Sequence, residues 1–416
     1  MKENKMINKS LTRIKLLSIF IIITFIFISC REDSPLEPVE KSRGQLISSE
    51  LKGNYSTSFL QFLINPLAGN LPVNNYLRFD VEAYKVVYRT KDWKGNIVTA
   101  SGAIYIPKGK DVLSLISLQH GTQTKRDNVA SVNPLTAVDG LIAASLGYFA
   151  LVPDYLGLGE SNSIHPYHHQ KSSAECVIDF IRAGRSFART KNLKLNGQVF
   201  LAGYSEGGYV TLATLKEIEQ SYRGEFSISA TAPMAGAYDL ILTARSIIQK
   251  QTYNQPSYLA FFFAAYDNIY GWNRLNQIFN SPYAERIPAL FDGTKTTTEI
   301  NAQLNISLSQ LFKANFINGF LNGSESLVLS AFESNSLLNW TPSTPIRFYH
   351  GDSDEFVPYE NSVSARNYFR SKGANVELVT IPGGTHATSV LPSIIGAIEW
   401  FETLRMNKNS GMLATY

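Results

Sequence analysis

The stretch Gly203-Tyr-Ser-Glu-Gly207 combines a hydroxyl group with closely spaced glycines, in the pattern G-x-S-x-G. An apolar run at 199–202 precedes it and a helix-like run at 209–218 follows it, which predicts a strand, a tight turn and a helix. A serine on such a turn has a strained backbone and an outward-facing hydroxyl, and glycines avoid collisions with the adjoining strand and helix. Ser205 is therefore predicted to be a nucleophile.

A serine nucleophile requires a general base, and the base requires a carboxylate that fixes its tautomer. The segment His350-Gly-Asp-Ser-Asp-Glu-Phe-Val-Pro358 follows an apolar run, at the carboxyl end of a predicted strand, where functional groups of parallel sheets gather. We predict that Asp354 is the acid and that Asp352 forms a turn; the alternative for Asp354 is a helix N-cap. His386 is the only histidine after this segment and is predicted to be the base.

Acyl transfer also requires two N–H groups that bind the developing oxyanion. The segment Gln119-His-Gly-Thr122 ends the apolar run at 112–119, and Glu206 begins the helix after the turn. We assign the two donors to the backbone N–H groups of Thr122 and Glu206, and we expect His120 to shape the loop. The histidines of 165–169 do not have the spacing of a known metal site, so we expect a loop near the site entrance there and no metal or cofactor.

The N-terminal 29 residues read as an export signal. A basic segment precedes an apolar run at 16–28, which as a helix would be only about 20 Å long, shorter than a membrane span. Ser29-Cys30 resembles the lipobox of bacterial lipoproteins, although Phe27 departs from the usual leucine, so Cys30 is predicted to carry lipid. An ordinary signal peptide and an uncleaved anchor are the alternatives. These features predict a protein that is exported and anchored to a membrane.

Charge argues against a nucleic-acid partner. Residues 1–29 contain five of the 38 basic side chains and one of the 34 acidic ones, so the rest of the 416-residue chain has no net charge. Residues 31–50 are polar, contain two prolines and are predicted to be a flexible tether, followed by one domain at 51–416. The segment 59–77 has no assignable pattern.

The pattern along this domain predicts an α/β fold, with a mostly parallel central sheet and helices on both faces. The stretch from 238 to about 342 interrupts it with an aromatic, helix-like insertion, which we interpret as a cap over the site; the alternative is a subdomain remote from it. Strands are predicted at 83–89 and 97–106, as a hairpin, and at 112–119, 148–152, 199–202, 228–234, 346–349 and 376–381, and helices at 138–146, 174–188, 209–220, 361–370 and 390–404.

Together these motifs resemble the α/β-hydrolase superfamily over roughly 79–405. The segment Pro153-Asp-Tyr-Leu-Gly-Leu-Gly159 and the serine turn are similar to those of secretory lipases and related esterases, in which glutamine often occupies the place of Glu206. The resemblance implies a serine esterase or lipase that forms an acyl-enzyme on Ser205, acts on small-molecule or lipid esters and needs no cofactor. A peptidase of the aminopeptidase or prolyl oligopeptidase type, or a surface binding protein on an inactive hydrolase scaffold, remains the alternative.

Overall fold

A computed structural model of the protein describes residues 42–68 and 77–413. The predicted signal peptide at 1–29, the predicted lipid attachment at Cys30 and residues 31–41 of the predicted tether lie outside this part of the chain. Among the described residues, no helix is both long enough and apolar enough to cross a membrane. Cys176 is buried and free, and burial raises the pKa of its thiol to about 12.

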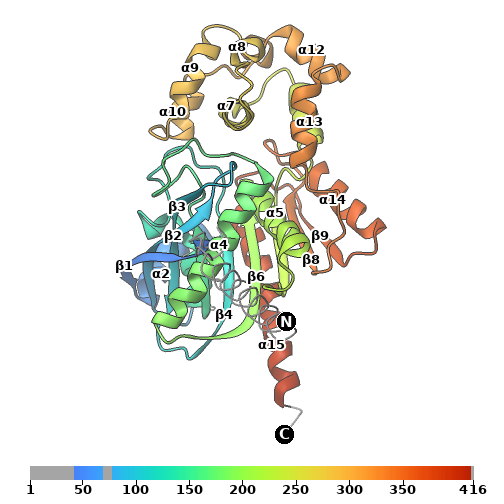
Figure 1. Ribbon diagram of the computed structural model, residues 1–416. Helices are drawn as coiled ribbons and strands as arrows, with labels where there is room; N and C mark the ends of the chain where they lie inside the picture. Colours follow the sequence, from blue (N-terminus) through green and yellow to red (C-terminus); the bar gives the residue numbers. More distant parts are fainter. Residues whose placement is uncertain (1–41, 69–76, 414–416) are drawn as a thin grey trace, which may run out of the picture. The chain divides into compact units, whose positions relative to one another are not determined.

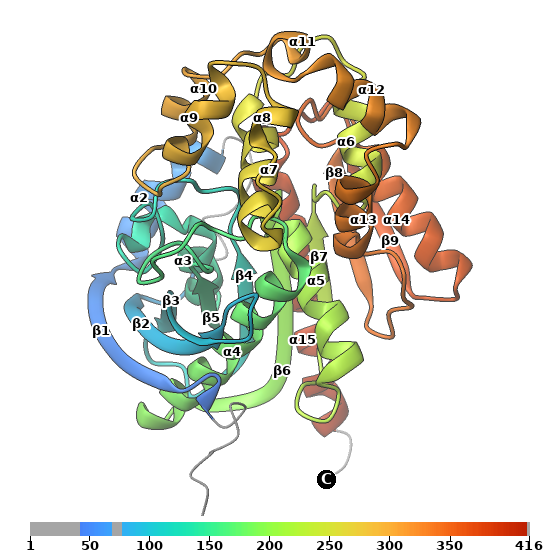
Figure 2. The same cartoon turned by 45° about the horizontal axis from the view of Figure 1, so that its top comes forward.

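One sheet of nine strands runs through the described residues, in the spatial order β1-β2-β3-β5-β4-β6-β7-β8-β9 (Figures 1 and 2). The pairs among β1, β2, β3 and β5 are antiparallel, and those from β5 through β4 to β9 are parallel. This confirms the predicted mostly parallel sheet. The strands are β1 (Leu46–Tyr55), β2 (Val81–Lys91), β3 (Ile97–Pro107), β4 (Val112–Gln119), β5 (Tyr148–Pro153), β6 (Lys194–Tyr204), β7 (Ala230–Met234), β8 (Ile346–Gly351) and β9 (Val376–Ile381).

Helices cover both faces of the sheet, as predicted for this fold class. One face packs against α4, α5 and α14, and the other packs against α2, α3 and α15, so that two apolar cores flank the strands. Outside the insertion, the helical segments are α2 (Thr57–Ala68), the short 3-10 helix η3 (Pro134–Thr136), α3 (Val138–Ser145), α4 (Gln170–Thr190), α5 (Glu206–Ser221), α14 (Glu360–Ser371) and α15 (Val390–Leu413).

The predicted hairpin forms between β2 and β3, which pair from Val81 opposite Pro107 to Lys91 opposite Ile97. Its turn is closed by the carboxylate of Asp92, which accepts hydrogen bonds from the backbone N–H groups of two residues further along the turn. Gly95 has φ of +86°, a left-handed conformation that glycine adopts without steric penalty. The turn signal in the sequence therefore has a clear structural cause.

The predicted tether of 31–50 is too long at its C-terminal end, because residues 46–50 belong to strand β1. This edge strand is mostly exposed and has no alternating apolar pattern from which it could be predicted. Just before it, the buried Arg43 forms ion pairs with Glu175 and Asp179 of α4, which fix the chain against the domain. The unassigned segment at 59–77 begins within α2. The sequence predicts six strands before the insertion, whereas the structure has seven, because β1 was not predicted.

The insertion is helical, as expected, and lies beyond one end of the sheet (Figures 1 and 2). Its interior is aromatic: the ring of Phe263 meets those of Phe279, Phe312 and Phe316 edge-on, with centroids 5.2–5.8 Å apart. These rings belong to the same apolar core as α4 and α5. The helices are α6 (Leu240–Ile248), α7 (Pro256–Tyr270), α8 (Leu275–Ile278), α9 (Tyr283–Leu290), α10 (Thr297–Asn301), α11 (Leu308–Leu311), α12 (Ala314–Asn322) and α13 (Ser326–Asn335).

Candidate active site

Ser205 is the single residue between the end of β6 and the start of α5. Its backbone has φ of +60° and ψ of −122°, a strained conformation for a residue with a side chain. The surrounding structure holds it there, because its N–H donates to the carbonyl oxygen of Met234 at 2.9 Å. The strand, turn and helix predicted around this serine are all present.

The glycines of this turn are required by space. A Cβ atom at Gly207 would lie 1.9 Å from the carbonyl oxygen of Gln119, and one at Gly203 would lie 2.5 Å from the carbonyl oxygen of Gly207. Gly208 lies as close to β7, since a Cβ there would be 2.2 Å from the carbonyl oxygen of Met234. Any side chain at these positions would push the turn away from β4 or β7 and move Ser205.

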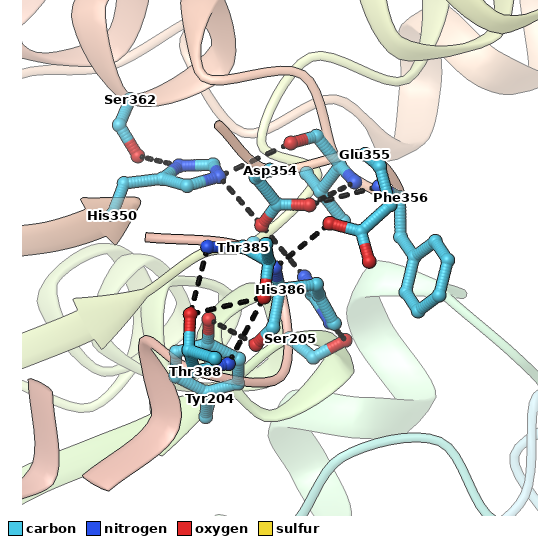
Figure 3. A network of polar contacts seen from close by, with 12 residues as sticks. Tyr204, Ser205, His350, Asp354, Glu355, Phe356, Ser362, Thr385, His386 and Thr388 are labelled. Carbon is cyan, nitrogen blue, oxygen red and sulfur yellow. Dashed lines mark hydrogen bonds and ion pairs between the residues drawn. The ribbon is translucent and has the colours of Figure 1, made fainter. Parts of the chain in front are cut away.

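Three side chains far apart in the sequence form one hydrogen-bonded chain (Figure 3). The Oγ atom of Ser205 lies 2.9 Å from Nε2 of His386, and Nδ1 of His386 lies 2.6 Å from Oδ2 of Asp354. Because the carboxylate accepts from Nδ1–H, Nε2 of His386 is free to accept the serine proton. The loops after β8 and β9 supply the acid and the histidine, at the same sheet edge as the serine turn.

Asp354 is held as an anion by four donors. Its Oδ1 accepts from the backbone N–H groups of Phe356 and Val357, both at 2.9 Å, while Oδ2 is shared by His386 and by Nε2 of His350 at 3.1 Å. Burial alone would raise the pKa of this carboxyl, but the hydrogen bonds and the two histidines hold it well below its usual range. It therefore stays ionised throughout the neutral range.

His350 is a residue of this site whose role the sequence did not predict. It is the last residue but one of β8, is fully buried, and its Nδ1 lies 2.7 Å from Oγ of Ser362 on α14. The ring thus links the aspartate to a helix behind the sheet and fixes the direction of its Oδ2. The only feature of the sequence that could have indicated this supporting role is the position of His350 at the end of a predicted strand, two residues before Asp352.

The loop that carries His386 is fastened on both sides. Its backbone N–H donates to the carboxylate of Glu355 at 3.0 Å, and its carbonyl oxygen accepts from the hydroxyl of Tyr204 at 2.8 Å. Asp352 faces the neighbouring part of that loop, where it accepts from the N–H of Gly383 at 2.7 Å. The two aspartates thus differ in position: Asp354 faces the histidine ring, and Asp352 joins two loops.

The two residues assigned to the oxyanion site lie beside the serine. Glu206 is the first residue of α5, so its backbone N–H has no partner within the helix. A Cβ atom at Gly121 would lie 3.7 Å from Cβ of Ser205, which shows how closely the loop carrying Thr122 approaches. The hydroxyls of Thr122 and Tyr167 are 2.8 Å apart, so a hydrogen bond joins this loop to the segment that contains Tyr167.

His120 supports that loop from behind. Its ring stacks on Tyr155 with centroids 4.1 Å apart, and its Nε2 donates to the carbonyl oxygen of Asp154 at 3.1 Å. The segment 153–159 turns tightly here, since a Cβ atom at Gly157 would lie 2.4 Å from the backbone nitrogen of His165. This lipase-like segment therefore shapes the site from beneath and contributes no side chain to the hydrogen-bonded chain.

A pocket opens from Ser205 into the insertion. Helices α6 and α7 supply half of its lining residues, α13 adds Phe332, and the loop after β8 adds Phe356 and Val357. The lining is overwhelmingly apolar, as suits an acyl chain or another water-avoiding group. The insertion thus adjoins the site, in agreement with its interpretation as a cap. Its lining residues include Leu240, Ala244, Ile247, Tyr258, Leu259 and Phe262.

Of the three histidines of 165–169, one, His168, lines this pocket. His165 and His168 are buried, and His168 lines the pocket, while His169 is the N-cap of α4, with Nδ1 2.8 Å from Oγ of Ser172. Burial lowers the pKa of both His168 and His169 to about 4. Both rings are consequently uncharged at neutral pH.

We expect the free energy of unfolding to decrease as the pH falls from about 6.5 to about 4. In this window the unfolded chain binds protons at His168 and His169 while the folded chain does not, so stability rises with pH. Each histidine contributes up to about 1.4 kcal/mol per pH unit. Urea unfolding at a series of pH values measures this, with His169→Gln as the comparison.

The glutamine variant keeps an oxygen for the helix N-terminus but cannot bind a proton, so its stability should depend less steeply on pH. A variant whose stability follows the same curve as the unaltered protein would contradict the assignment.

Residues 129–411 match the family model described as secretory lipase. The chain is 24% identical over 327 residues to a secreted triacylglycerol lipase of Malassezia furfur, covering 72% of this chain and 58% of that protein, so the match spans little more than half of the relative. Among solved structures, the rice cell wall degrading esterase LipA of Xanthomonas oryzae is 27% identical, with a TM-score of 0.76, covering 85% of this chain and 95% of that one.

A protein from Legionella pneumophila described as a hydrolase is 25% identical, with a TM-score of 0.80 over 86% of this chain and 98% of that one. Candida antarctica lipase A in its closed state is 16% identical, with a TM-score of 0.67 over 89% and 85% of the two chains, which shows a likeness of fold alone. Together with the sheet order, the serine turn and the helical insertion described above, these likenesses identify an α/β-hydrolase fold.

Proposed function

Because the chain belongs to the secretory lipase family, we propose that it is an exported serine hydrolase that cleaves carboxylic ester bonds. One observation carries this proposal: Oγ of Ser205 lies 2.9 Å from Nε2 of His386, whose Nδ1 lies 2.6 Å from Asp354. A serine, a histidine and an ionised aspartate in this sequence of contacts form the arrangement that activates a hydroxyl as a nucleophile.

In the proposed reaction His386 accepts the proton of Ser205 as the hydroxyl oxygen attacks the ester carbonyl. The carboxylate of Asp354 holds the histidine tautomer and stabilises the imidazolium that forms. The backbone N–H groups of Thr122 and Glu206 bind the oxyanion, each worth on the order of a hundredfold to a thousandfold in rate. His386 then donates its proton to the departing alcohol and later activates the water that hydrolyses the acyl-enzyme.

The apolar pocket supports an acyl group as the part of the substrate that is bound most closely. It begins at Ser205 and is walled by α6 and α7 of the insertion, so an acyl chain on the serine can bury its methylenes there. A peptide substrate with a charged terminus would have to leave that charge in this apolar lining. The substrate class that the site favours is therefore an ester of an apolar or mainly apolar acid.

Export and anchoring form part of the proposal. The basic and apolar segments of 1–29 support a signal peptide, and Ser29-Cys30 supports lipid attachment at Cys30. A related Malassezia protein is described as secreted. We infer that the mature protein acts outside the cytoplasm and is attached to a membrane by the lipid on Cys30. Residues 31–41 would connect this cysteine to the domain.

A series of p-nitrophenyl esters of increasing acyl length, measured beside aminoacyl p-nitroanilides, tests the proposed activity. We expect hydrolysis of the esters and little or none of the anilides, because the pocket lining is overwhelmingly apolar and a free ammonium group would lose its water shell there. Faster hydrolysis of the anilides would identify a peptidase. Turnover of neither class would support a binding protein on a hydrolase scaffold.

A further inference from the structure

Glu206 lines the apolar pocket, and its carboxylate takes no part in the reaction proposed above, which uses only the backbone N–H of this residue. The residue follows the nucleophile directly, is 1% exposed and lines the pocket together with Ser205. A buried carboxylate is unfavourable unless hydrogen bonds and an opposite charge compensate it. What surrounds its two oxygens therefore decides what the pocket can bind.

One oxygen, Oε1, is fully engaged with His165, whose Nε2 lies 2.6 Å away. The other ring nitrogen of His165 lies 2.7 Å from the carbonyl oxygen of Leu156. The two ring nitrogens of His165 are therefore both engaged by acceptors of the protein, and neither is left to bind a substrate group. Burial alone would raise the pKa of Glu206, but His165 holds it below its usual range.

The other oxygen, Oε2, is buried and has no hydrogen-bond partner among the described residues. The same is true of Nδ1 of His168, which also lines the pocket and whose residue is 3% exposed. Buried polar atoms without a partner are a small minority in folded proteins, and a bound water molecule or ligand is one explanation for them. Here both atoms belong to residues that line the pocket beginning at the nucleophile.

The charge of Glu206 also acts across the pocket. Tyr258, on α7, also lines the pocket, and its pKa is raised first by burial and then by the carboxylate of Glu206. A substrate group in the pocket would therefore be exposed to the negative charge of this carboxylate. Glu206 is adjacent in sequence to Ser205, so the acceptor and the acylated oxygen belong to neighbouring residues that line the same pocket.

The geometry points to Glu206 Oε2 as the acceptor for a hydroxyl on the acyl group, so that the preferred substrates are esters of hydroxy acids with the hydroxyl on one of the first carbons after the carbonyl. This inference rests on the proposed ester hydrolysis and names the substrate class within it. Glu206 acts as a residue that determines specificity, while its backbone N–H binds the oxyanion.

A hydroxyl fits this place better than an ammonium group does. A hydroxyl has one hydrogen to donate, which Oε2 can accept, whereas an ammonium group brings three donors and a charge that must be desolvated in an overwhelmingly apolar lining. A hydroxyl adds a charge-assisted hydrogen bond and no net charge. An acyl group that has neither a hydroxyl nor an ammonium group leaves Oε2 without a hydrogen-bond partner.

Three p-nitrophenyl esters test the inference on the full-length protein: butyrate, 3-hydroxybutyrate and 3-methoxybutyrate. Each kcat/KM is divided by the rate constant of alkaline hydrolysis of the same ester, which removes differences in intrinsic reactivity. We expect the hydroxy ester to exceed butyrate by about 10-fold to 100-fold, the range for a hydrogen bond to a charged group. The methoxy ester, which cannot donate, should not exceed butyrate.

The variant Glu206→Gln keeps the side-chain shape and an oxygen for His165 but replaces the charged acceptor. We expect it to lower the ratio of hydroxybutyrate to butyrate by about tenfold, since neutral hydrogen bonds are weaker than charge-assisted ones. Glu217→Gln is the matched control, because it makes the same change on the same helix, and its ratio should equal that of the unaltered protein.

The possible failures are distinguishable. No turnover of any ester would contradict the proposed function, and the inference with it. Turnover with equal rates on butyrate and 3-hydroxybutyrate would leave the proposed function intact and overturn the inference. A hydroxyl preference that survives Glu206→Gln would assign the acceptor to another residue. If that variant does not fold, the hydroxy and methoxy esters decide the question alone.

Discussion

Replacing Asp354 by asparagine is expected to lower kcat by on the order of 10⁴-fold, while Asp352→Asn is expected to change it by less than about tenfold. The reason is the tautomer of His386. The carboxylate of Asp354 accepts Nδ1–H at 2.6 Å, but an amide nitrogen there can donate instead, which places the proton on Nε2 and prevents it from accepting the proton of Ser205. Ester hydrolysis under saturating substrate measures the effect.

Asp352→Asn is a matched control, because it makes the same chemical change two residues away on the same loop. Its carboxylate accepts from the N–H of Gly383, and the amide oxygen of asparagine can replace that acceptor. Equal losses in the two variants would mean that the effect is one of loop structure and that the acid has been assigned to the wrong residue.

The second large effect is expected at the nucleophile. Ser205→Ala should lower kcat by about 10⁴-fold to 10⁶-fold, because no covalent intermediate can form and only the oxyanion site and substrate binding remain. Ser353→Ala, at an exposed serine on the loop after β8, should leave turnover unchanged.

Thermal unfolding should give closely similar midpoints for Ser205→Ala and the unaltered protein, since alanine retains Cβ and the same strained backbone. A Ser205→Ala variant that retains substantial turnover would show that another group attacks the ester. A variant that has lost its fold would have to be replaced by Ser205→Cys, which should also lose most of its ester hydrolysis.

Much of the fold could be predicted because local pattern and tertiary position coincide. The parallel strands β4 to β9 are apolar runs with polar turns between them, and the serine turn is marked by glycines that the structure leaves no room to replace. Strand β1 could not be predicted, because it lies at the sheet edge with both faces largely exposed and so has no apolar period.

The candidate site divides in the same way. Ser205, Asp354 and His386 could be identified from residue type, chain order and their places after strands. The supporting contacts could not: His350 acts through a shared oxygen, and Glu206 meets His165, 41 positions earlier in the chain, only after the turn has folded. Nor does the sequence indicate which aromatic side chains of the insertion face the pocket, because most of them are buried whether or not they line it.

The central claim is that Ser205 is an activated nucleophile, and the most direct measurement is its reaction with a fluorophosphonate probe followed by mass spectrometry of the digested protein. The account predicts a single adduct on the peptide that contains Ser205, absent from Ser205→Ala and strongly reduced in His386→Ala. An unlabelled native protein, or an adduct on any other serine, would contradict it.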